Sequence, residues 1–75
     1  MTKDQLIFAM NRDKVVVLPP QTKSGTEFHE DPEGLECLIE RIDRDGSVHQ
    51  AVLVDFEGNE YVVDEQDFSD IRLGH

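Results

Sequence analysis

This chain has one cysteine, no tryptophan and no long apolar run, and each of these features limits the kind of protein that it can be. Among 75 residues there is one cysteine, Cys37, and no tryptophan. A single cysteine cannot form an internal disulfide, which favours a reducing compartment. No apolar run is long enough to cross a bilayer, and no segment has the hydrophobic centre of a signal peptide. We therefore expect a cytoplasmic protein with no membrane contact.

Basic residues are also scarce. Lys and Arg total 7 against 17 Asp and Glu, a formal net charge of −10. Residues 1–26 hold four basic and two acidic side chains, a net of +2, whereas residues 27–75 hold three basic and 15 acidic, a net of −12. Such a field repels nucleic acid and anionic membranes and attracts basic proteins. The same charge also keeps a small protein soluble, so it does not by itself prove a partner.

Three apolar segments in the second half of the chain predict an antiparallel meander. They are residues 35–42, 48–56 and 61–64, and the tight turns 44–46 and 57–59 separate them. Asp-Gly at 45–46 is a strong hairpin signal because both central residues of such a turn need positive φ. In the segment 48–56 the residues with even numbers are the more apolar set. We expect that face to meet the core and the strand to be central, covered on both sides.

The remaining residues supply the elements that close this meander into one domain, 1–75. Thr2 and Gln5 match a capping box, which favours a helix of about two turns within residues 1–13, although a strand over residues 5–10 is the alternative. A strand over 14–18 ends at two prolines, and a long loop over 19–34 follows. We expect this loop to be mobile, with Phe28 as its one anchored point. One helical turn over 66–69 and a last strand over 71–73 complete the order. The expected core consists of Val16, Ile39, Val52, Val54, Phe56, Val63, Phe68 and Ile71.

This order of elements over residues 14–73 resembles the SH3-like five-stranded small barrel, and the Tudor and KOW branches of that superfold share its rhythm. The residues that carry the likeness are Gly34, Ile39, Val52–Asp55, Glu57-Gly58, Tyr61-Val62-Val63 and the pair Phe68 and Ile71. The resemblance implies a mainly β fold with a short N-terminal helix and one helical turn before the last strand. It is a likeness of pattern, and a fold of this kind does not assign a function.

The motifs that could support chemistry are weak. Residues 43–46 resemble part of a calcium loop, but that register places Val52 where a bidentate glutamate belongs, so we interpret them as a hairpin turn. His29, Glu30 and Asp31 are adjacent loop residues without the spacing of a structural zinc site. Glu36 and Glu40 fit a solvated strand face better than a general acid and base. We therefore predict no enzyme, no catalytic residue, no cofactor and no metal site.

The acidic surface leaves two hypotheses for function. The first is a non-catalytic interaction module, a small regulator or accessory subunit that docks on a basic protein surface or peptide, as a monomer or within a larger complex. The second is a nucleic-acid mimic, an inhibitor of the kind that phages use against host defences. A continuous stripe of carboxylates would favour mimicry, and a scattered distribution would favour local docking. The candidate partner-binding residues are Glu27, Phe28, Glu30, Asp31, Glu33, Glu57, Glu60, Asp64, Glu65 and Asp67, with Phe28 as the apolar anchor if it is not part of the core.

Overall fold

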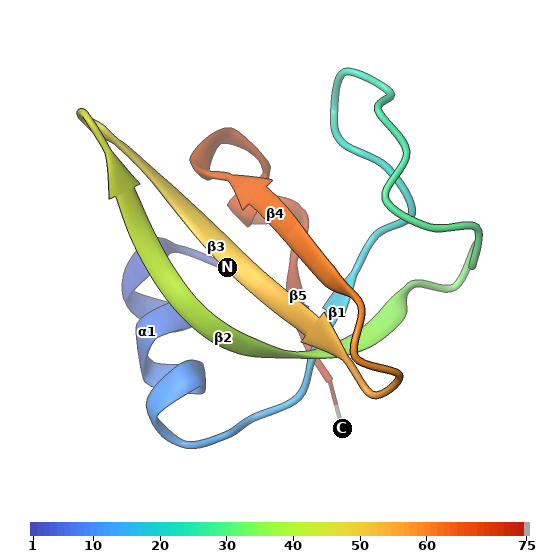
Figure 1. Cartoon of the computed structure of the whole chain (residues 1–75), viewed down its shortest axis with the longest axis horizontal. Helices are drawn as coiled ribbons and strands as arrows, with labels where there is room; N and C mark the ends of the chain where they lie inside the picture. The colour runs from blue at the N-terminus through green and yellow to red at the C-terminus, as the bar shows by residue number, and fades with distance from the viewer. Residues whose placement is uncertain (75) are drawn as a thin grey trace.

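A computed structural model describes residues 1–74 and shows a mainly β fold with a short N-terminal helix (Figure 1). The radius of gyration of the Cα atoms is 11.2 Å, close to the value of about 11 Å expected for a compact domain of this length. No helix within the described residues is long and apolar enough to cross a membrane. The elements in chain order are α1 (Lys3–Asn11), β1 (Val16–Leu18), β2 (Leu35–Asp45), β3 (Val48–Asp55), β4 (Glu60–Asp64), the 3₁₀ helix η1 (Glu65–Asp70) and β5 (Arg72–Leu73).

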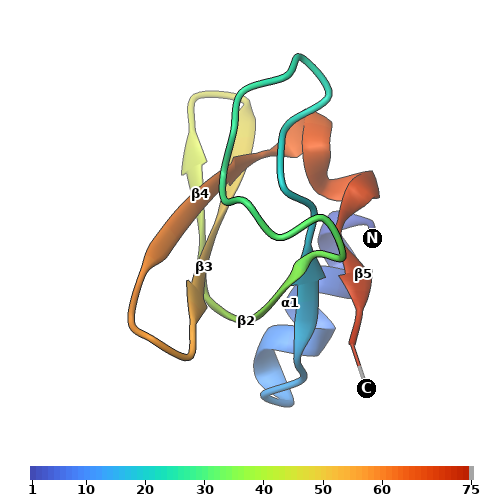
Figure 2. The same ribbon diagram turned by 90° about the vertical axis from the view of Figure 1, so that its right-hand side faces the viewer.

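The five strands form one antiparallel sheet in the order β4-β3-β2-β1-β5. The predicted meander is therefore confirmed as β2, β3 and β4. Among the described residues β4 and β5 each have a neighbour on one side only, so the sheet is not closed. Figure 2 shows these two edge strands on opposite sides of the molecule. The antiparallel five-stranded sheet is thus confirmed, while a closed barrel is not.

Helix α1 begins at the predicted capping box. The backbone N–H of Gln5 donates to Thr2 Oγ1 at 3.2 Å, and Gln5 Oε1 accepts from the Thr2 N–H at 2.9 Å. These bonds satisfy two backbone donors that the first turn of a helix leaves free. Leu6 and Ala9 are buried against the sheet, and Met10 is partly buried there. The helix is confirmed, and the alternative strand over residues 5–10 is wrong.

The core contacts the opposite face of β3 from the one that the sequence favoured. Ala51 and Leu53 are fully buried in the core, together with Leu6 and Ala9 of the helix. Because side chains alternate along a strand, the even-numbered residues of β3 lie on the outer face. Five of the residues predicted as core belong to the same cluster as Ala51 and Leu53: Val16, Ile39, Val63, Phe68 and Ile71.

Of the three other residues predicted as core, Val52 is buried as expected, although it lies outside the main core cluster, and Val54 and Phe56 are not buried. Val52 and Val54 occupy the outer face of β3, where Val52 is still covered by its neighbours and Val54 is half-buried. Phe56 is 68% exposed, so its assignment to the core is wrong. The physical reason is the cover that α1 and η1 provide. They contribute Leu6, Ala9 and Phe68 to the core on the side of Ala51 and Leu53, and within residues 1–74 no helix covers the outer side in this way.

A β-bulge in β2 keeps its apolar residues on the core face. Ile39 lies opposite Leu53 and Arg41 lies opposite Val52, which leaves Glu40 as the extra residue. The shift brings Ile42 opposite Ala51, so that Ile39 and Ile42 both contact the core despite their odd spacing.

Candidate functional site

One carboxylate organises the turn between β3 and β4. Asp55 is buried, and its Oδ1 accepts hydrogen bonds from the backbone N–H groups of Glu57 at 2.9 Å and Asn59 at 2.8 Å. Its Oδ2 accepts from Asn59 Nδ2 at 3.0 Å and from the Tyr61 hydroxyl at 3.2 Å. These bonds, with that from the Asn59 side chain first, lower the pKa of Asp55 below its ordinary value because they stabilise the charged form. The turn is therefore held in one conformation.

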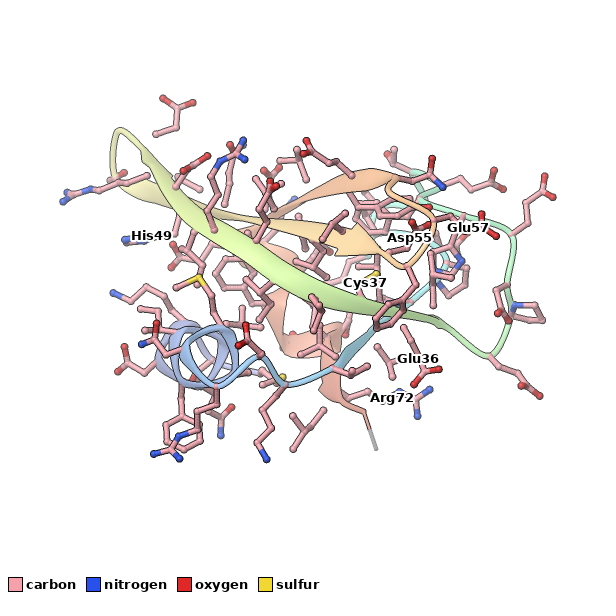
Figure 3. The ribbon with its side chains drawn as sticks, turned by 60° about the horizontal axis from the view of Figure 1, so that its bottom comes forward. Glu36, Cys37, His49, Asp55, Glu57 and Arg72 are labelled. Carbon is pink, nitrogen blue, oxygen red and sulfur yellow. The ribbon has the colours of Figure 1, made fainter. Side chains whose placement is uncertain are left out.

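Phe56 follows Asp55 and projects from this fixed turn. It lines a shallow surface pocket together with Asp31 from the loop, Glu36 from β2 and Glu57 from the turn. Figure 3 shows Glu57 and Asp55 at the same end of the sheet. Within residues 1–74 none of the three carboxylates Asp31, Glu36 and Glu57 forms an ion pair. We call this group, an exposed aromatic ring with three carboxylates, the Phe56 patch.

The loop of residues 19–34 contributes to the patch and is fixed to the body of the protein at several points. Phe28 is partly buried against the core, as the sequence predicted for an anchor. It is not the one anchored point, however. His29 Nε2 is 2.8 Å from the carbonyl oxygen of Leu18, and the His29 ring packs edge-on against Tyr61 at 6.2 Å between centroids. The loop therefore presents its acidic residues from a defined position.

Lys23 provides a third attachment of the loop, to η1. The Lys23 backbone N–H donates to Asp67 Oδ1 at 2.9 Å. The ammonium group of Lys23 donates to the Gln66 carbonyl at 3.0 Å, to Ser69 Oγ at 2.7 Å and to Asp70 Oδ2 at 3.1 Å. These residues are more than forty positions apart in sequence, so no local pattern could have predicted their contact.

The structure divides the predicted partner-binding residues into separate groups. Glu57 and Asp31 meet at the Phe56 patch. Three further acidic loop residues are exposed but do not line this patch: Glu27, Glu30 and Glu33. Glu60 and Asp64 lie on the outer face of β4. Phe28 and Asp67 face inward, and Asp67 serves the loop attachment described above.

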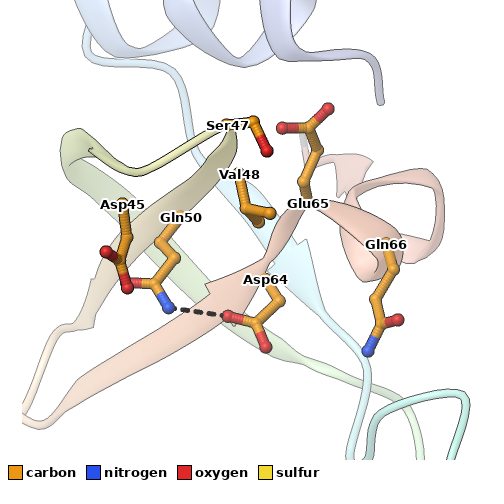
Figure 4. A pocket seen from close by; sticks show the side chains of 7 residues that line it. All are labelled: Asp45, Ser47, Val48, Gln50, Asp64, Glu65 and Gln66. Atoms are coloured by element: carbon orange, nitrogen blue, oxygen red, sulfur yellow. Dashed lines mark hydrogen bonds between the residues drawn. The ribbon is translucent and has the colours of Figure 1, made fainter.

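Glu65 begins η1 and bonds to the start of β3. Its Oε1 accepts from the His49 backbone N–H at 2.9 Å and lies 2.9 Å from His49 Nδ1. These two contacts lower the pKa of Glu65, the backbone bond most. A polar groove opens beside this contact (Figure 4), where Gln50 Nε2 donates to Asp64 Oδ1 at 2.8 Å. The groove is lined by Asp45, Ser47, Val48, Gln50, Asp64, Glu65 and Gln66, and these acceptors suit basic side chains.

Among residues 1–74 no three His, Cys, Asp or Glu side chains are placed to hold a metal ion. Cys37 is fully buried, and burial, together with the nearby Asp55 charge, raises the pKa of its thiol to about 11. A thiol with that pKa is protonated at neutral pH and is a poor nucleophile.

Sequence reasoning missed Phe56 because it assigned this residue to the strand. A signal was present in Asp55, since an aspartate that begins a turn commonly bonds to the backbone two residues further on. Asp55 accepts from the Glu57 N–H in this way, which places Phe56 within the turn instead of on the pleated face.

Comparison with known proteins returned no match: no protein-family model, no curated protein and no solved structure matches the chain.

Proposed function

We propose that the chain is a non-catalytic interaction module that docks on a basic protein surface or peptide, as a small regulator or accessory subunit. The observation that carries this proposal is the Phe56 patch, in which a ring exposed by 68% stands beside Asp31, Glu36 and Glu57. A buried aromatic anchor commonly supplies much of the affinity of an interface, while charges around it speed encounter and select the partner. A cytoplasmic location, which the single unpaired cysteine favours, is part of the proposal.

The rigidity of the patch supports a binding role. Four hydrogen bonds to Asp55 hold the turn, and the loop that carries Asp31 is attached through Lys23 and His29. A surface that is ordered before binding loses less conformational entropy when a partner arrives. Phe56 is therefore a better anchor than Phe28, whose side chain already contributes to the core.

The arrangement of the sheet supports an SH3-like classification of the fold. The order β4-β3-β2-β1-β5, the long loop between β1 and β2 and the 3₁₀ turn before β5 follow the predicted rhythm. The sheet is open, and the likeness rests on topology alone. Since this architecture hosts many functions, it adds no argument for a particular ligand.

The distribution of carboxylates favours docking over nucleic-acid mimicry. Glu36, Glu40, Asp43 and Asp45 follow one strand, β2. Arg41 interrupts this row, because its guanidinium lies 2.7 Å from Glu40 Oε2 and 3.0 Å from Asp43 Oδ2. A phosphate mimic needs an unbroken series of free charges.

The proposal is tested by capture of a partner with the immobilised chain from a lysate of the source organism, followed by affinity measurements with the purified partner. Phe56→Ala should weaken binding about 30-fold, the effect of losing an anchor worth about 2 kcal/mol. Phe8→Ala is the matched control, because Phe8 is also an exposed phenylalanine, at 55%, but lies on α1 with the basic Arg12 side chain 4.3 Å from its ring.

The charge contribution is tested with the same partner. The double variant Asp31→Lys, Glu57→Lys should slow association several-fold, and raising the salt from 0.01 M to 0.15 M should weaken binding as the Debye length falls from about 30 Å to about 8 Å. Binding that is unchanged by Phe56→Ala, by the charge reversal and by salt would refute the proposal. If the partner's nucleic-acid ligand displaces the chain while Phe56→Ala has no effect, mimicry is the better explanation.

A further inference from the structure

Among residues 1–74, strand β4 is an edge strand that pairs with β3 alone. The Asp55 N–H donates to the Asn59 carbonyl at 3.0 Å, which fixes the alternation of bonded and non-bonded pairs along β3 and β4. In antiparallel pairing every second residue exchanges both backbone bonds with its opposite residue. The residues of β4 that bond to β3 are therefore Tyr61 and Val63. The three others, Glu60, Val62 and Asp64, direct their N–H groups away from β3.

The residues of this edge that direct their N–H groups outward are exposed to solvent. Glu60, Val62 and Asp64 are all exposed, with Val62 at 53%. Within residues 1–74 no backbone hydrogen bond joins Glu60 or Val62 to an element other than β3. Figure 2 shows β4 at the outer side of the sheet, opposite β5. Such a row of donors and acceptors is a template for another strand.

The side chains of this edge alternate in chemistry. Glu60, Val62 and Asp64 lie on the same outer face, about 7 Å apart by strand geometry, and Val62 is adjacent to Val52 of β3. In an added strand, three alternate side chains would lie opposite the acidic Glu60, the apolar Val62 and the acidic Asp64. Cross-strand pairs are favourable when opposite charges or two apolar groups face each other.

The same pattern disfavours a second copy of this chain. Antiparallel pairing of two β4 edges about Val62 would place Glu60 of each copy directly opposite Asp64 of the other. Like charges in directly opposite positions destabilise a sheet, and the net charge of −10 adds to the repulsion. Charge therefore selects against self-pairing and in favour of a basic segment.

We propose that the β4 edge binds an extended segment of a basic partner protein as a sixth strand, with a basic residue opposite Glu60, an apolar residue opposite Val62 and a basic residue opposite Asp64. The inference goes beyond docking at the Phe56 patch and rests on it only for the preference for basic partners. We take the added strand to be antiparallel, the commoner arrangement, in which the residue opposite Val62 exchanges both backbone hydrogen bonds with it. The two residues of the partner strand that lie between these three face the side of the sheet where His29 packs on Tyr61, and small side chains fit best at those two positions.

The first test uses a fluorescein-labelled synthetic peptide centred on Lys-Thr-Val-Thr-Lys and the unmodified chain. Fluorescence polarisation should show binding that weakens with salt. A peptide of the same sequence with an N-methyl group on the central valine loses one backbone donor and should bind about ten-fold more weakly, which is the effect of one lost hydrogen bond. Equal binding of the two peptides would overturn strand addition.

The second test changes the protein. Val62→Pro removes an N–H that the sheet does not use, and edge strands tolerate proline at such positions. Val62→Ala retains the N–H and is the matched control. We expect at least ten-fold weaker peptide binding for Val62→Pro and a smaller loss for Val62→Ala, with circular dichroism confirming that both variants are folded. Equal losses would mean that only the side chain contacts the peptide, and would overturn the proposal.

Three further measurements test the proposal, and the first of them separates it from the proposed function. Phe56→Ala should leave binding of the short peptide unchanged, because Phe56 lies in the turn between β3 and β4, outside the edge formed by residues 60–64. Sedimentation should show a monomer, and the double variant Glu60→Lys, Asp64→Lys should lose the basic peptide. If the peptide does not bind while the purified partner binds through Phe56, the edge proposal is wrong and the docking proposal stands.

Discussion

The placement of the core on one face of β3 can be tested with two adjacent residues. Leu53 is 0% exposed within the core cluster, whereas Val54, the next residue, is half-buried on the outer face. Leu→Ala substitutions in a closed core cost about 2–5 kcal/mol because they leave a cavity. Val54→Ala removes two methyl groups that are only partly covered, so at about 0.8 kcal/mol per fully buried methylene it should cost about 1 kcal/mol or less.

These values are large against the stability of the whole domain. At about 0.05–0.15 kcal/mol per residue, a chain of 75 residues has a free energy of unfolding of about 4–11 kcal/mol. With a urea m-value of about 1 kcal/mol per M, Leu53→Ala at about 3 kcal/mol lowers the unfolding midpoint by about 3 M, and Val54→Ala by about 1 M or less. Urea unfolding followed by circular dichroism measures both. An equal or larger loss for Val54→Ala would show that the sheet faces the core in the opposite sense, and would remove the basis for the outer face described above.

Three further predictions concern single side chains. Phe56→Ala should change the free energy of unfolding by less than about 0.5 kcal/mol, whereas Phe68→Ala, at a residue 3% exposed, should cost about 3–5 kcal/mol; the reverse order in thermal melts would contradict the assignment of the two rings. The pKa of Asp55 is lowered in the folded state, so the stability that Asp55 contributes is present above about pH 4, the pKa of an unfolded aspartate, and is lost as the pH falls through the lower folded pKa. Asp55→Asn should therefore lower the urea midpoint at pH 7, and the midpoint of this variant should fall less steeply in acid. An unchanged midpoint at pH 7 would exclude the role of Asp55 in the turn. Cys37, fully buried and with its pKa raised to about 11, should react with a disulfide reagent only at the rate of unfolding; rapid labelling of the folded chain would show that the core opens at β2.

Local sequence signals determined most of the secondary structure. Thr2 and Gln5 define the start of α1 because a capping box involves only the first turn of a helix. The hairpin loop was predicted at Asp45-Gly46 and lies one residue later, at Gly46-Ser47, where only Gly46 has positive φ. This loop, the proline pair after β1 and the 3₁₀ helix before β5 are likewise determined by residues near each other in sequence. The chain's acidity is a property of composition alone.

Only the tertiary structure decided which face of the sheet is buried. The alternation in β3 identifies two sets of residues, but both contain apolar side chains, and period two does not say which set α1 will cover. The extra residue Glu40 changes the parity of β2, so that Ile39 and Ile42 both reach the core. Phe28 is partly buried because its ring packs against core residues from distant segments, which the residues around it in sequence do not encode. The exposure of Phe56, by contrast, follows from the local turn that Asp55 begins.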